Sequence, residues 1–178
     1  MSDAKPVEAT DKKKAAVKLR KALLRLGIKL VSICVILVLL WCFVGEIYIL
    51  HNNNMYPHVK DGALLVTYKI GEPIKGDAIL YEQDGRMRVA RVVGTAGDVV
   101  MIDGSGNITV NGLQPAEYVF YPTYPTEGGI EFPLTVETGT CFVLNDFRES
   151  CEDSRMFGCV PIDEMHGKIV LMIQHRDI

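Results

Sequence analysis

The residues whose types could support catalysis or binding gather in one short polar stretch, His51 to Val66, HNNNMYPHVKDGALLV. Its three consecutive asparagines, residues 52–54, carry carboxamides, which donate and accept hydrogen bonds but are neither basic nor nucleophilic enough for acyl transfer. His51 and His58 flank them, and two imidazoles seven residues apart in a loop are a weak pattern for a metal site. The sequence has no CxxC or HExxH motif and no Gly-rich phosphate loop. We therefore expect neither a metal nor a cofactor.

The chain has five cysteines. Cys34 and Cys42 lie within a long apolar run, where packing against apolar surroundings is the simplest role. Cys141, Cys151 and Cys159 follow much later, and Cys151 with Cys159 could close a short loop through a disulfide. Spacing alone does not establish the bond geometry, so this disulfide stays open as an alternative to free thiols.

The polar stretch directly follows an uncharged apolar run, LVSICVILVLLWCFVG, residues 30–45. Extended to residues 28–50, a helix would be about 34 Å long, enough for a hydrocarbon core of about 30 Å. No small-x-small cleavage site follows, so we expect an uncleaved signal-anchor over residues 30–50 rather than a signal peptide. Residues 1–29 hold nine Lys/Arg against three Asp/Glu, which predicts a cytoplasmic tail and a single-pass plasma-membrane protein with residues 51–178 outside the cytoplasm.

Charge also limits the class of partner. The formal net charge is −3, and the excess of basic residues is confined to the tail that precedes the apolar run. A nucleic-acid binder needs its basic charge on the folded domain, where it can contact phosphates. The sequence therefore argues against nucleic acid, and we interpret the basic tail as a solvated topogenic signal for the apolar run that follows, with an interfacial helix as the alternative.

After Leu50 the sequence changes to short apolar or alternating runs separated by Gly, Pro, Asn and Asp. Such runs predict strands, and the DGR and SGN segments predict two hairpins. We expect an all-β barrel or sandwich-like exterior domain, with a loop over residues 120–133 and a turn near residues 161–165. The expected strands cover residues 63–70, 78–83, 87–94, 98–104, 107–112, 140–146 and 167–174.

The order of these segments resembles the type I signal peptidases of the bacterial plasma membrane. NNNMYPHVKDGALLVTYK is similar to that family's Ser-Gly-Ser-Met-x-Pro box and the strand after it, and VARVVGTAGDVV is similar to its Lys-Arg-Val-x-Gly-x-x-Gly-Asp box. GEPIKGDAILYE, NGLQPAEY and LNDFRESCEDSRMFGCV match further segments in the same order. The resemblance implies a signal-peptidase-like fold and assigns structural roles to Arg91, Asp98, Asp146, Arg148, Asp153 and Arg155.

The same resemblance exposes four departures at the positions that carry the family's chemistry. The family implies a serine nucleophile, a buried neutral lysine as its base, a second serine that orients the lysine, and a hydroxyl that helps hold the oxyanion. These positions are Asn54, Ala90, Cys151 and Asn52 here. Members of a catalytic set act together, so we expect no ordinary signal-peptidase turnover and assign no catalytic residue.

A signal-peptidase cleft holds its substrate as an added extended strand, which needs no catalytic pair. The resemblance implies that a peptide is contacted by Leu50, Asn52, Asn54, Met55, Val59 and Val89. Plain core packing is the alternative for Met55 and Val89. An open cleft also invites self-association through a neighbouring copy.

Signal-peptidase-like proteins without the Ser–Lys pair accompany sortase-polymerised pili in some Gram-positive bacteria. The resemblance therefore implies a non-catalytic pilus-assembly factor or chaperone that binds extended peptide of pilin subunits or a sortase. An active signal peptidase with an unusual dyad is the alternative, with Cys151 and His51 or His58 as one form of it and cyclisation of Asn54 as a further self-cleaving chemistry. A regulatory decoy that binds preproteins is a third class.

Overall fold

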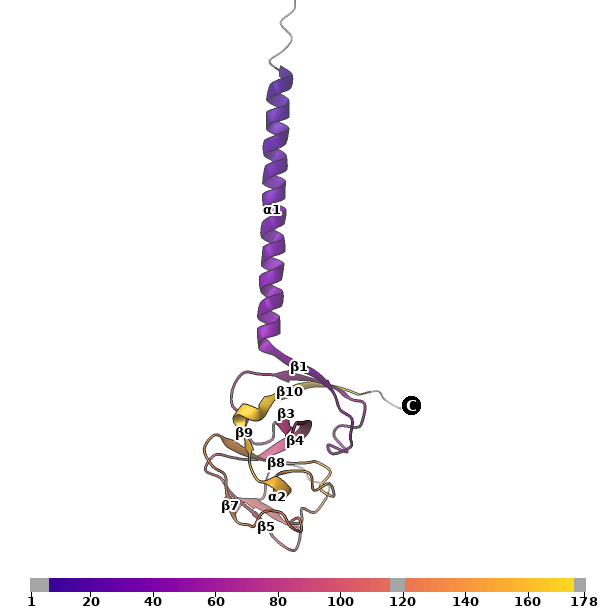
Figure 1. Ribbon diagram of the computed structural model, residues 1–178, viewed down its shortest axis with the longest axis vertical. Helices are drawn as coiled ribbons and strands as arrows, with labels where there is room; N and C mark the ends of the chain where they lie inside the picture. The colour runs from indigo at the N-terminus through magenta and orange to yellow at the C-terminus, as the bar shows by residue number, and fades with distance from the viewer. Residues whose placement is uncertain (1–6, 116–120, 175–178) are drawn as a thin grey trace, which may run out of the picture. The chain divides into compact units, whose positions relative to one another are not determined.

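The computed structural model describes residues 7–115 and 121–174 of the 178-residue chain, which divides into two units, Met1–Cys42 and Phe43–Ile178. Helix α1, Val7–Phe43, is a single long helix (Figure 1). Its segment Val17–Leu39 has a mean hydropathy of 2.4 and is long and apolar enough to cross a membrane. At 1.5 Å per residue this segment measures about 34 Å, which matches the hydrocarbon thickness.

The position of the apolar segment differs from the span expected from the sequence. The predicted anchor continued to Leu50, but the helix ends at Phe43 and residues 44–49 form strand β1, Val44–Ile49. Tyr48 belongs to this strand. The error has a physical cause: VGEIYI is apolar enough to extend a membrane segment, and a short apolar run does not distinguish strand from helix.

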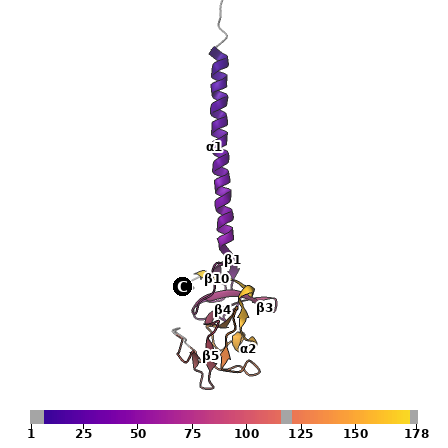
Figure 2. The ribbon, with the colours of Figure 1, turned by 90° about the vertical axis from the view of Figure 1, so that its left-hand side faces the viewer.

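The second unit is mostly β, as predicted, and contains two sheets (Figure 1). The larger sheet has the strand order β1-β2-β10-β3-β4-β8-β9, and the smaller has the order β6-β5-β7. In Figures 1 and 2, β1 and β10 lie at one end of this unit and β5 lies at the other. The remaining strand bounds are β2 Leu64–Tyr68, β3 Ala78–Gln83, β4 Arg86–Thr95, β5 Val99–Ile102, β6 Ile108–Val110, β7 Leu134–Thr135, β8 Thr140–Leu144, β9 Val160–Pro161 and β10 Met165–Ile173.

Both predicted hairpins are present. Strands β3 and β4 are joined by Asp84 and Gly85, whose φ values of 53° and 70° are those of a two-residue turn with both φ positive. This turn fixes the antiparallel register, in which Tyr81 lies opposite Arg88 and Ile79 opposite Ala90. Strands β5 and β6 form the second hairpin, with Val100 opposite Val110.

Alternation along β4 sends neighbouring side chains into different parts of the core. Val89 packs into an apolar cluster with Met55 and Leu80, whereas Ala90 packs into a second cluster with Ile79 and Tyr81. Successive residues on a strand point to opposite faces of the sheet, so Arg88, Ala90 and Val92 lie on one face of β4. Tyr81 is paired with Arg88 across the hairpin and therefore lies on the same face. A third cluster, which includes Phe142 and Val100, joins the smaller sheet to the larger one.

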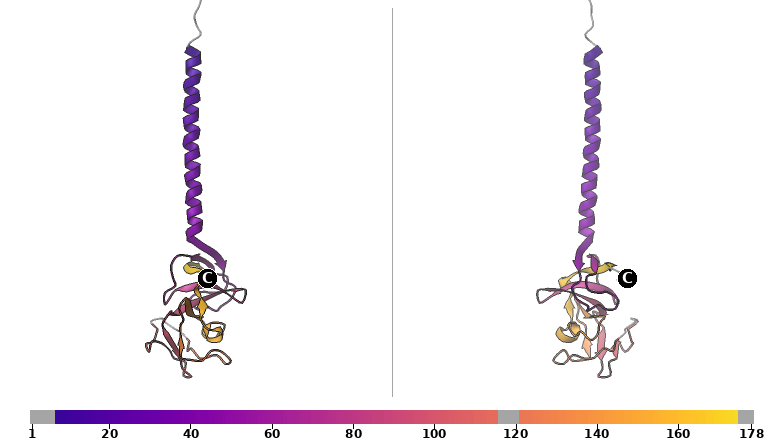
Figure 3. Two further views of the ribbon diagram at one scale, coloured as in Figure 1. Left: turned by 60° about the vertical axis from the view of Figure 1, so that its left-hand side comes forward. Right: turned by 90° about the vertical axis from the view of Figure 1, so that its right-hand side faces the viewer.

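Two short helices interrupt the β pattern. The turn predicted near residues 161–165 is the 3-10 helix η1, Ile162–Glu164. Helix α2, Ser154–Phe157, was not predicted, because four residues are too few for a helical period to show in the sequence. Asp153 caps α2 by accepting a hydrogen bond from the backbone N–H of Arg155. Figure 3 shows α2 as one short helical turn late in the chain.

Candidate functional site

Three segments far apart in the sequence meet at the positions that sequence analysis singled out. The carbonyl of Asn54 accepts a hydrogen bond of 2.9 Å from the N–H of Phe147, which joins the polar loop to the segment between β8 and α2. Strand β4 contacts that same segment on either side of Ala90, through Arg88 to Glu152 and through Arg91 to Asp146. The structure therefore brings the neighbourhoods of positions 54, 90 and 151 together.

The asparagines shape the polar loop through their own side chains. The Oδ1 atom of Asn52 accepts the N–H of Asn54 at 3.1 Å, and the Oδ1 atom of Asn53 accepts the N–H of Asp61 at 3.1 Å. Asparagine side chains commonly bond the backbone two residues on in this way. By resemblance, the N–H of residue 54 is the donor that would hold an oxyanion. In this structure the N–H of Asn54 already donates a hydrogen bond to the side-chain oxygen of Asn52.

Ala90 is fully buried, with 0% of its surface exposed. Its methyl group packs among apolar side chains that include Ile79, Val92 and Val143. A methyl group cannot accept a proton, and the tight packing leaves position 90 as a structural element of the core. The two positions that the resemblance assigns to nucleophile and base thus carry a carboxamide and a methyl group.

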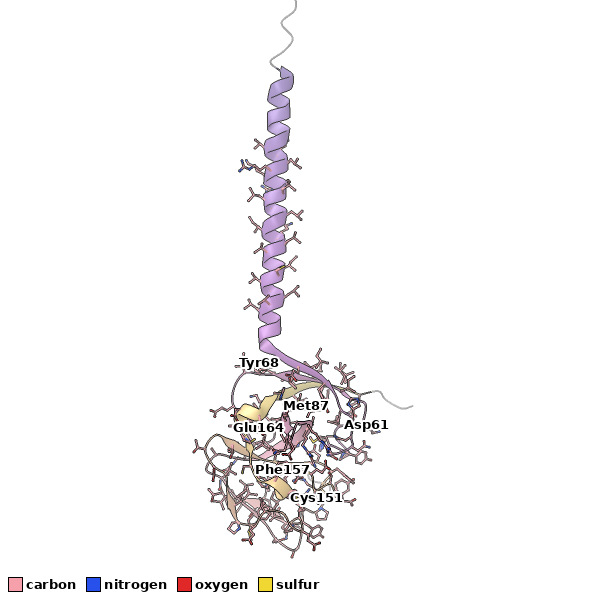
Figure 4. The ribbon with its side chains drawn as sticks, in the orientation of Figure 1. Asp61, Tyr68, Met87, Cys151, Phe157 and Glu164 are labelled. Atoms are coloured by element: carbon pink, nitrogen blue, oxygen red, sulfur yellow. The ribbon has the colours of Figure 1, made fainter. Side chains whose placement is uncertain are left out.

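The cysteines are free thiols among the described residues, so the disulfide considered for Cys151 and Cys159 is not formed. Cys151 is partly exposed in the loop that leads into α2 (Figure 4), and its thiol donates to the carbonyl of Glu149 at 3.7 Å. Cys159 instead packs against the cluster of Phe142. Burial raises the pKa of the Cys141 thiol to about 12, which makes this thiol unreactive at neutral pH.

The residues predicted to be structural form buried ion pairs and hydrogen bonds. Arg91 binds Asp146 through two nitrogens, at 2.8 and 2.6 Å, and His58 Nδ1 lies 3.0 Å from the same carboxylate. Arg155 bonds Asp153 at 2.9 and 2.8 Å, with both side chains buried. Arg148 is also buried. Bidentate arginine–carboxylate contacts fix the relative orientation of the two side chains, so they hold the segments of the site in place.

Asp98 organises the turn after β4. Burial raises the pKa of this carboxyl, but hydrogen bonds from the N–H of Thr95, from Asn111 and from Lys75 outweigh burial, so the pKa lies below its usual value. The corresponding donor–acceptor distances are 2.8, 2.7 and 3.2 Å. Asp98 is therefore ionised at neutral pH and serves the fold.

The predicted peptide-contacting set divides into two groups. Asn52 and Asn54 are partly exposed and could meet a ligand. The four apolar members are closed in one cluster, with exposed fractions of 0% for Leu50, Met55 and Val59 and 2% for Val89. Their burial corrects the expectation of direct contact, since these side chains form the wall behind the loop rather than its surface. The alternative of core packing for Met55 and Val89 matches what the structure has.

An unpaired strand edge borders the loop instead. Strand β8 pairs with β4 only from Arg91 to Thr95, so the first half of β4, residues 86–90, is paired with β3 alone in the parts of the chain that the structure describes. Such an edge presents backbone N–H and C=O groups to an extended peptide. A hydrophobicity pattern could not reveal this edge, because it depends on where β8 stops pairing.

Sequence reasoning also missed Tyr81 and Arg88, which face the same side of the sheet as Ala90. Arg88 Nη1 binds the Glu152 carboxylate at 2.9 Å, and its guanidinium lies 5.9 Å from the ring centre of Phe157, labelled in Figure 4. The available signal was the turn at residues 84–85, because it makes Tyr81 and Arg88 opposite partners in the hairpin.

Comparison with known proteins gives consistent matches. The family model described as "Signal peptidase, peptidase S26" matches residues 23–174. Signal peptidase I of Bacillus caldolyticus is 30% identical over 155 residues, which cover 78% of this chain and 84% of that protein. Signal peptidase IB of Staphylococcus aureus is 28% identical over 171 residues, covering 85% and 89% of the two chains. A solved signal peptidase I of Enterococcus faecalis is 25% identical, covers 57% of this chain and 99% of its own, and has a TM-score of 0.47.

Proposed function

This chain belongs to the signal peptidase family, peptidase S26, and from that premise we propose that it is a membrane-anchored, non-catalytic member that binds an extended peptide without cutting it. The observation that carries the proposal is the pair of side chains at positions 54 and 90. A carboxamide and a buried methyl group replace the nucleophile and the base, while the surrounding ion pairs and turns are intact.

The state of the polar loop supports the same reading. Without a nucleophile, catalysis by this family's route would rest on polarisation of the scissile carbonyl alone. The backbone donor for that polarisation is bonded by Asn52, so even this residual contribution requires a hydrogen bond to break first. Peptide pairing along β4 needs none of these groups, because main-chain hydrogen bonds supply its affinity.

We further propose that the peptide belongs to a pilin subunit or a sortase, and that the protein acts as a pilus-assembly factor or chaperone. The support is the resemblance to signal-peptidase-like proteins that lack the Ser–Lys pair. In this proposal α1 spans the plasma membrane once, the basic residues before it face the cytoplasm, and the β unit lies outside.

A gene deletion tests the assembly role. In the native bacterium, the pilin polymer ladder on an immunoblot should disappear or shorten on deletion and return when the wild-type gene is supplied. An unchanged ladder in the deletion strain contradicts the assembly role. Pull-down from membranes then identifies the partner, because a preprotein recovered in place of pilin or sortase indicates the decoy class.

An active signal peptidase is the second candidate, favoured by the identity to signal peptidase I of Bacillus caldolyticus. Purified full-length protein in nanodiscs, incubated with a preprotein that a catalytic signal peptidase cleaves, separates the two candidates. We expect no mature product. Cleavage that is lost on Asn54→Ala or Cys151→Ala would establish an unrecognised dyad and overturn the non-catalytic proposal.

A further inference from the structure

Two buried polar atoms lie near Ala90 without a hydrogen-bond partner among the described residues: the hydroxyl of Tyr81 and the Nε of Arg88. Tyr81 is 0% exposed, and its aromatic ring packs in the same cluster as Ala90. Buried polar groups in native proteins nearly always have a partner, and each exception needs an explanation such as a ligand or an ordered water. Here two exceptions occur in one place.

The hairpin register brings these two atoms toward each other. Tyr81 and Arg88 are directly opposite on β3 and β4, so their side chains leave the same face with Cβ atoms about 5 Å apart. Ala90 is the diagonal neighbour of Tyr81 on that face, at about 7–8 Å. We name the Tyr81 hydroxyl, the Arg88 Nε and the Ala90 methyl group together the Tyr81–Arg88 niche.

The niche is a place for an acceptor oxygen. Arg88 Nε can only donate a hydrogen bond, and the Tyr81 hydroxyl can rotate to donate as well. Glu152 does not meet either group, since its carboxylate binds Nη1 of Arg88. One oxygen atom that accepted from both donors would therefore satisfy both, and a carboxylate or carboxamide oxygen has the lone pairs to do so.

Access to the niche runs from the open edge of β4. The Arg88 side chain is 17% exposed and that of Glu152 is 66% exposed, so their ion pair closes the niche with a contact that solvent reaches. Exposed ion pairs contribute little to stability, and this one can open at small cost. Ala90 and Tyr81 are themselves fully buried, so a peptide side chain reaches Tyr81 only once this ion pair opens, and the methyl group of Ala90 is then the small side chain that it passes.

We propose that the Tyr81–Arg88 niche binds a glutamine or glutamate side chain of a peptide that pairs with the β4 edge. Alternate side chains of an added strand fall on the face of Arg88 and Ala90. One of them must cross β4 above Ala90 to reach Tyr81, which favours the longer amide and acid over asparagine and aspartate. The inference rests on the proposed peptide binding and specifies which peptides are preferred.

A peptide panel tests this preference on the full-length protein in nanodiscs. The probes are fluorescein-labelled Thr-Val-Xaa-Val-Thr pentapeptides with blocked ends, in which Xaa is Gln, Glu, Met or Ala, and affinity is measured by fluorescence polarisation. Met is close to Gln in length and shape but lacks a strong acceptor. We expect Gln and Glu peptides to bind about 25-fold more tightly than the Met peptide, since two hydrogen bonds are gained and each is equivalent to about fivefold in affinity.

Substitutions at the niche provide the second arm. Tyr81→Phe should lower the affinity ratio of the Gln peptide to the Met peptide about fivefold and leave the Met peptide unchanged. Arg88→Met should lower the affinity ratio of the Glu peptide to the Met peptide by about fivefold, because one of the two donors is lost. Tyr68→Phe is the matched control, because Tyr68 lies on β2 outside the cluster of Ala90, and it should keep the wild-type ratio.

The outcomes separate this inference from the proposed function. Equal affinities for the Gln and Met peptides, or a ratio that Tyr81→Phe leaves unchanged, overturn the niche while peptide binding stands. Absence of binding by every peptide of the panel overturns both.

Discussion

Tyr81→Phe should make the ligand-free protein more stable, which is the reverse of the usual effect of deleting a buried polar group. The tyrosine is fully buried and its hydroxyl has no partner among the described residues. Burial raises the pKa of this hydroxyl well above its ordinary value, although the nearby Arg88 guanidinium acts in the opposite direction. The native state therefore carries the desolvation cost of a hydroxyl without a compensating bond.

The size of the effect follows from that cost. Leaving a buried hydroxyl unsatisfied costs about 1–3 kcal/mol, and the substitution removes one oxygen atom while keeping the ring that packs in the core. Allowing for the small void that remains, we expect a gain of about 1–2 kcal/mol in the free energy of unfolding. For a domain of this size, that gain corresponds to a rise in Tm of about 4–8 °C.

Calorimetry on the full-length protein in nanodiscs is the suitable assay. The single tryptophan, Trp41, belongs to α1 and the β unit contains none, so calorimetry is preferred to tryptophan fluorescence. Hydrogen exchange of β3 and β4 amides gives an independent measure of the same free energy. Tyr68→Phe serves as control and should change stability by less than about 0.5 kcal/mol.

A fall in Tm for Tyr81→Phe would refute the reasoning. A hydroxyl that has a partner, such as an ordered water, contributes about 1 kcal/mol, and its deletion would lower Tm by about 4 °C. In that case the Tyr81 hydroxyl would have its explanation without a peptide. If Tyr81→Phe is more stable than the wild type and binds the Gln peptide more weakly, then the Tyr81 hydroxyl contributes to binding at the expense of stability.

Three further predictions concern other parts of the β unit. Because the pKa of Asp98 is lowered in the folded state, its contribution to stability is present above the unfolded pKa of about 4 and is lost as pH falls through the folded pKa. Asp98→Asn should therefore be less stable than the wild type at pH 7 and should lose less stability between pH 5 and pH 3, as measured by acid titrations followed by circular dichroism. Equal losses of stability in the two proteins over this pH range would contradict the prediction. Iodoacetamide at pH 8 should modify the partly exposed Cys151 at least a hundredfold faster than Cys141, because the raised pKa of Cys141, about 12, keeps that thiol protonated. Peptide mass spectrometry measures both modification rates, and similar rates would contradict the burial of Cys141. Gly45→Ala should destabilise by about 1–3 kcal/mol, since a Cβ there would overlap the Thr67 hydroxyl, and an unchanged Tm would show that β1 yields locally.

The sequence predicted the β class and both hairpins because their signals are local. Asp84-Gly85 encodes a turn with two positive φ values, and the flanking runs alternate with period two. The end of the membrane segment was not predictable in the same way, since β1 is nearly as apolar as the helix before it. Composition cannot say whether such residues face lipid or another strand.

Motif spacing predicted which segments meet, but it predicted the exposure of their side chains only in part. Asn54, Ala90 and Cys151 were found from motif spacing, and the structure brings their segments together through Phe147 and Glu152. The four apolar members of the expected peptide surface turned out to be core, because whether a side chain faces inward or outward near a loop depends on tertiary packing. The sequence could not predict the open edge of β4, because that edge depends on where the pairing with β8 ends. It could not predict the unpaired donors of the niche either, because they depend on which acceptors lie within reach in the folded chain.

Under the proposed non-catalytic function, the burial of Ala90 bears on whether the family's reaction could be regained. Recovery of the family's reaction would need a serine at position 54 and a lysine at position 90 in the same molecule, and either change alone gives no turnover for selection to favour. The lysine would also have to enter a tightly packed interior at a cost of about 1–3 kcal/mol, borne before any benefit. On this proposal, related chains would change the peptide that they bind more readily than they would regain cleavage, and inhibitors that acylate a catalytic serine should not react with position 54 of this protein.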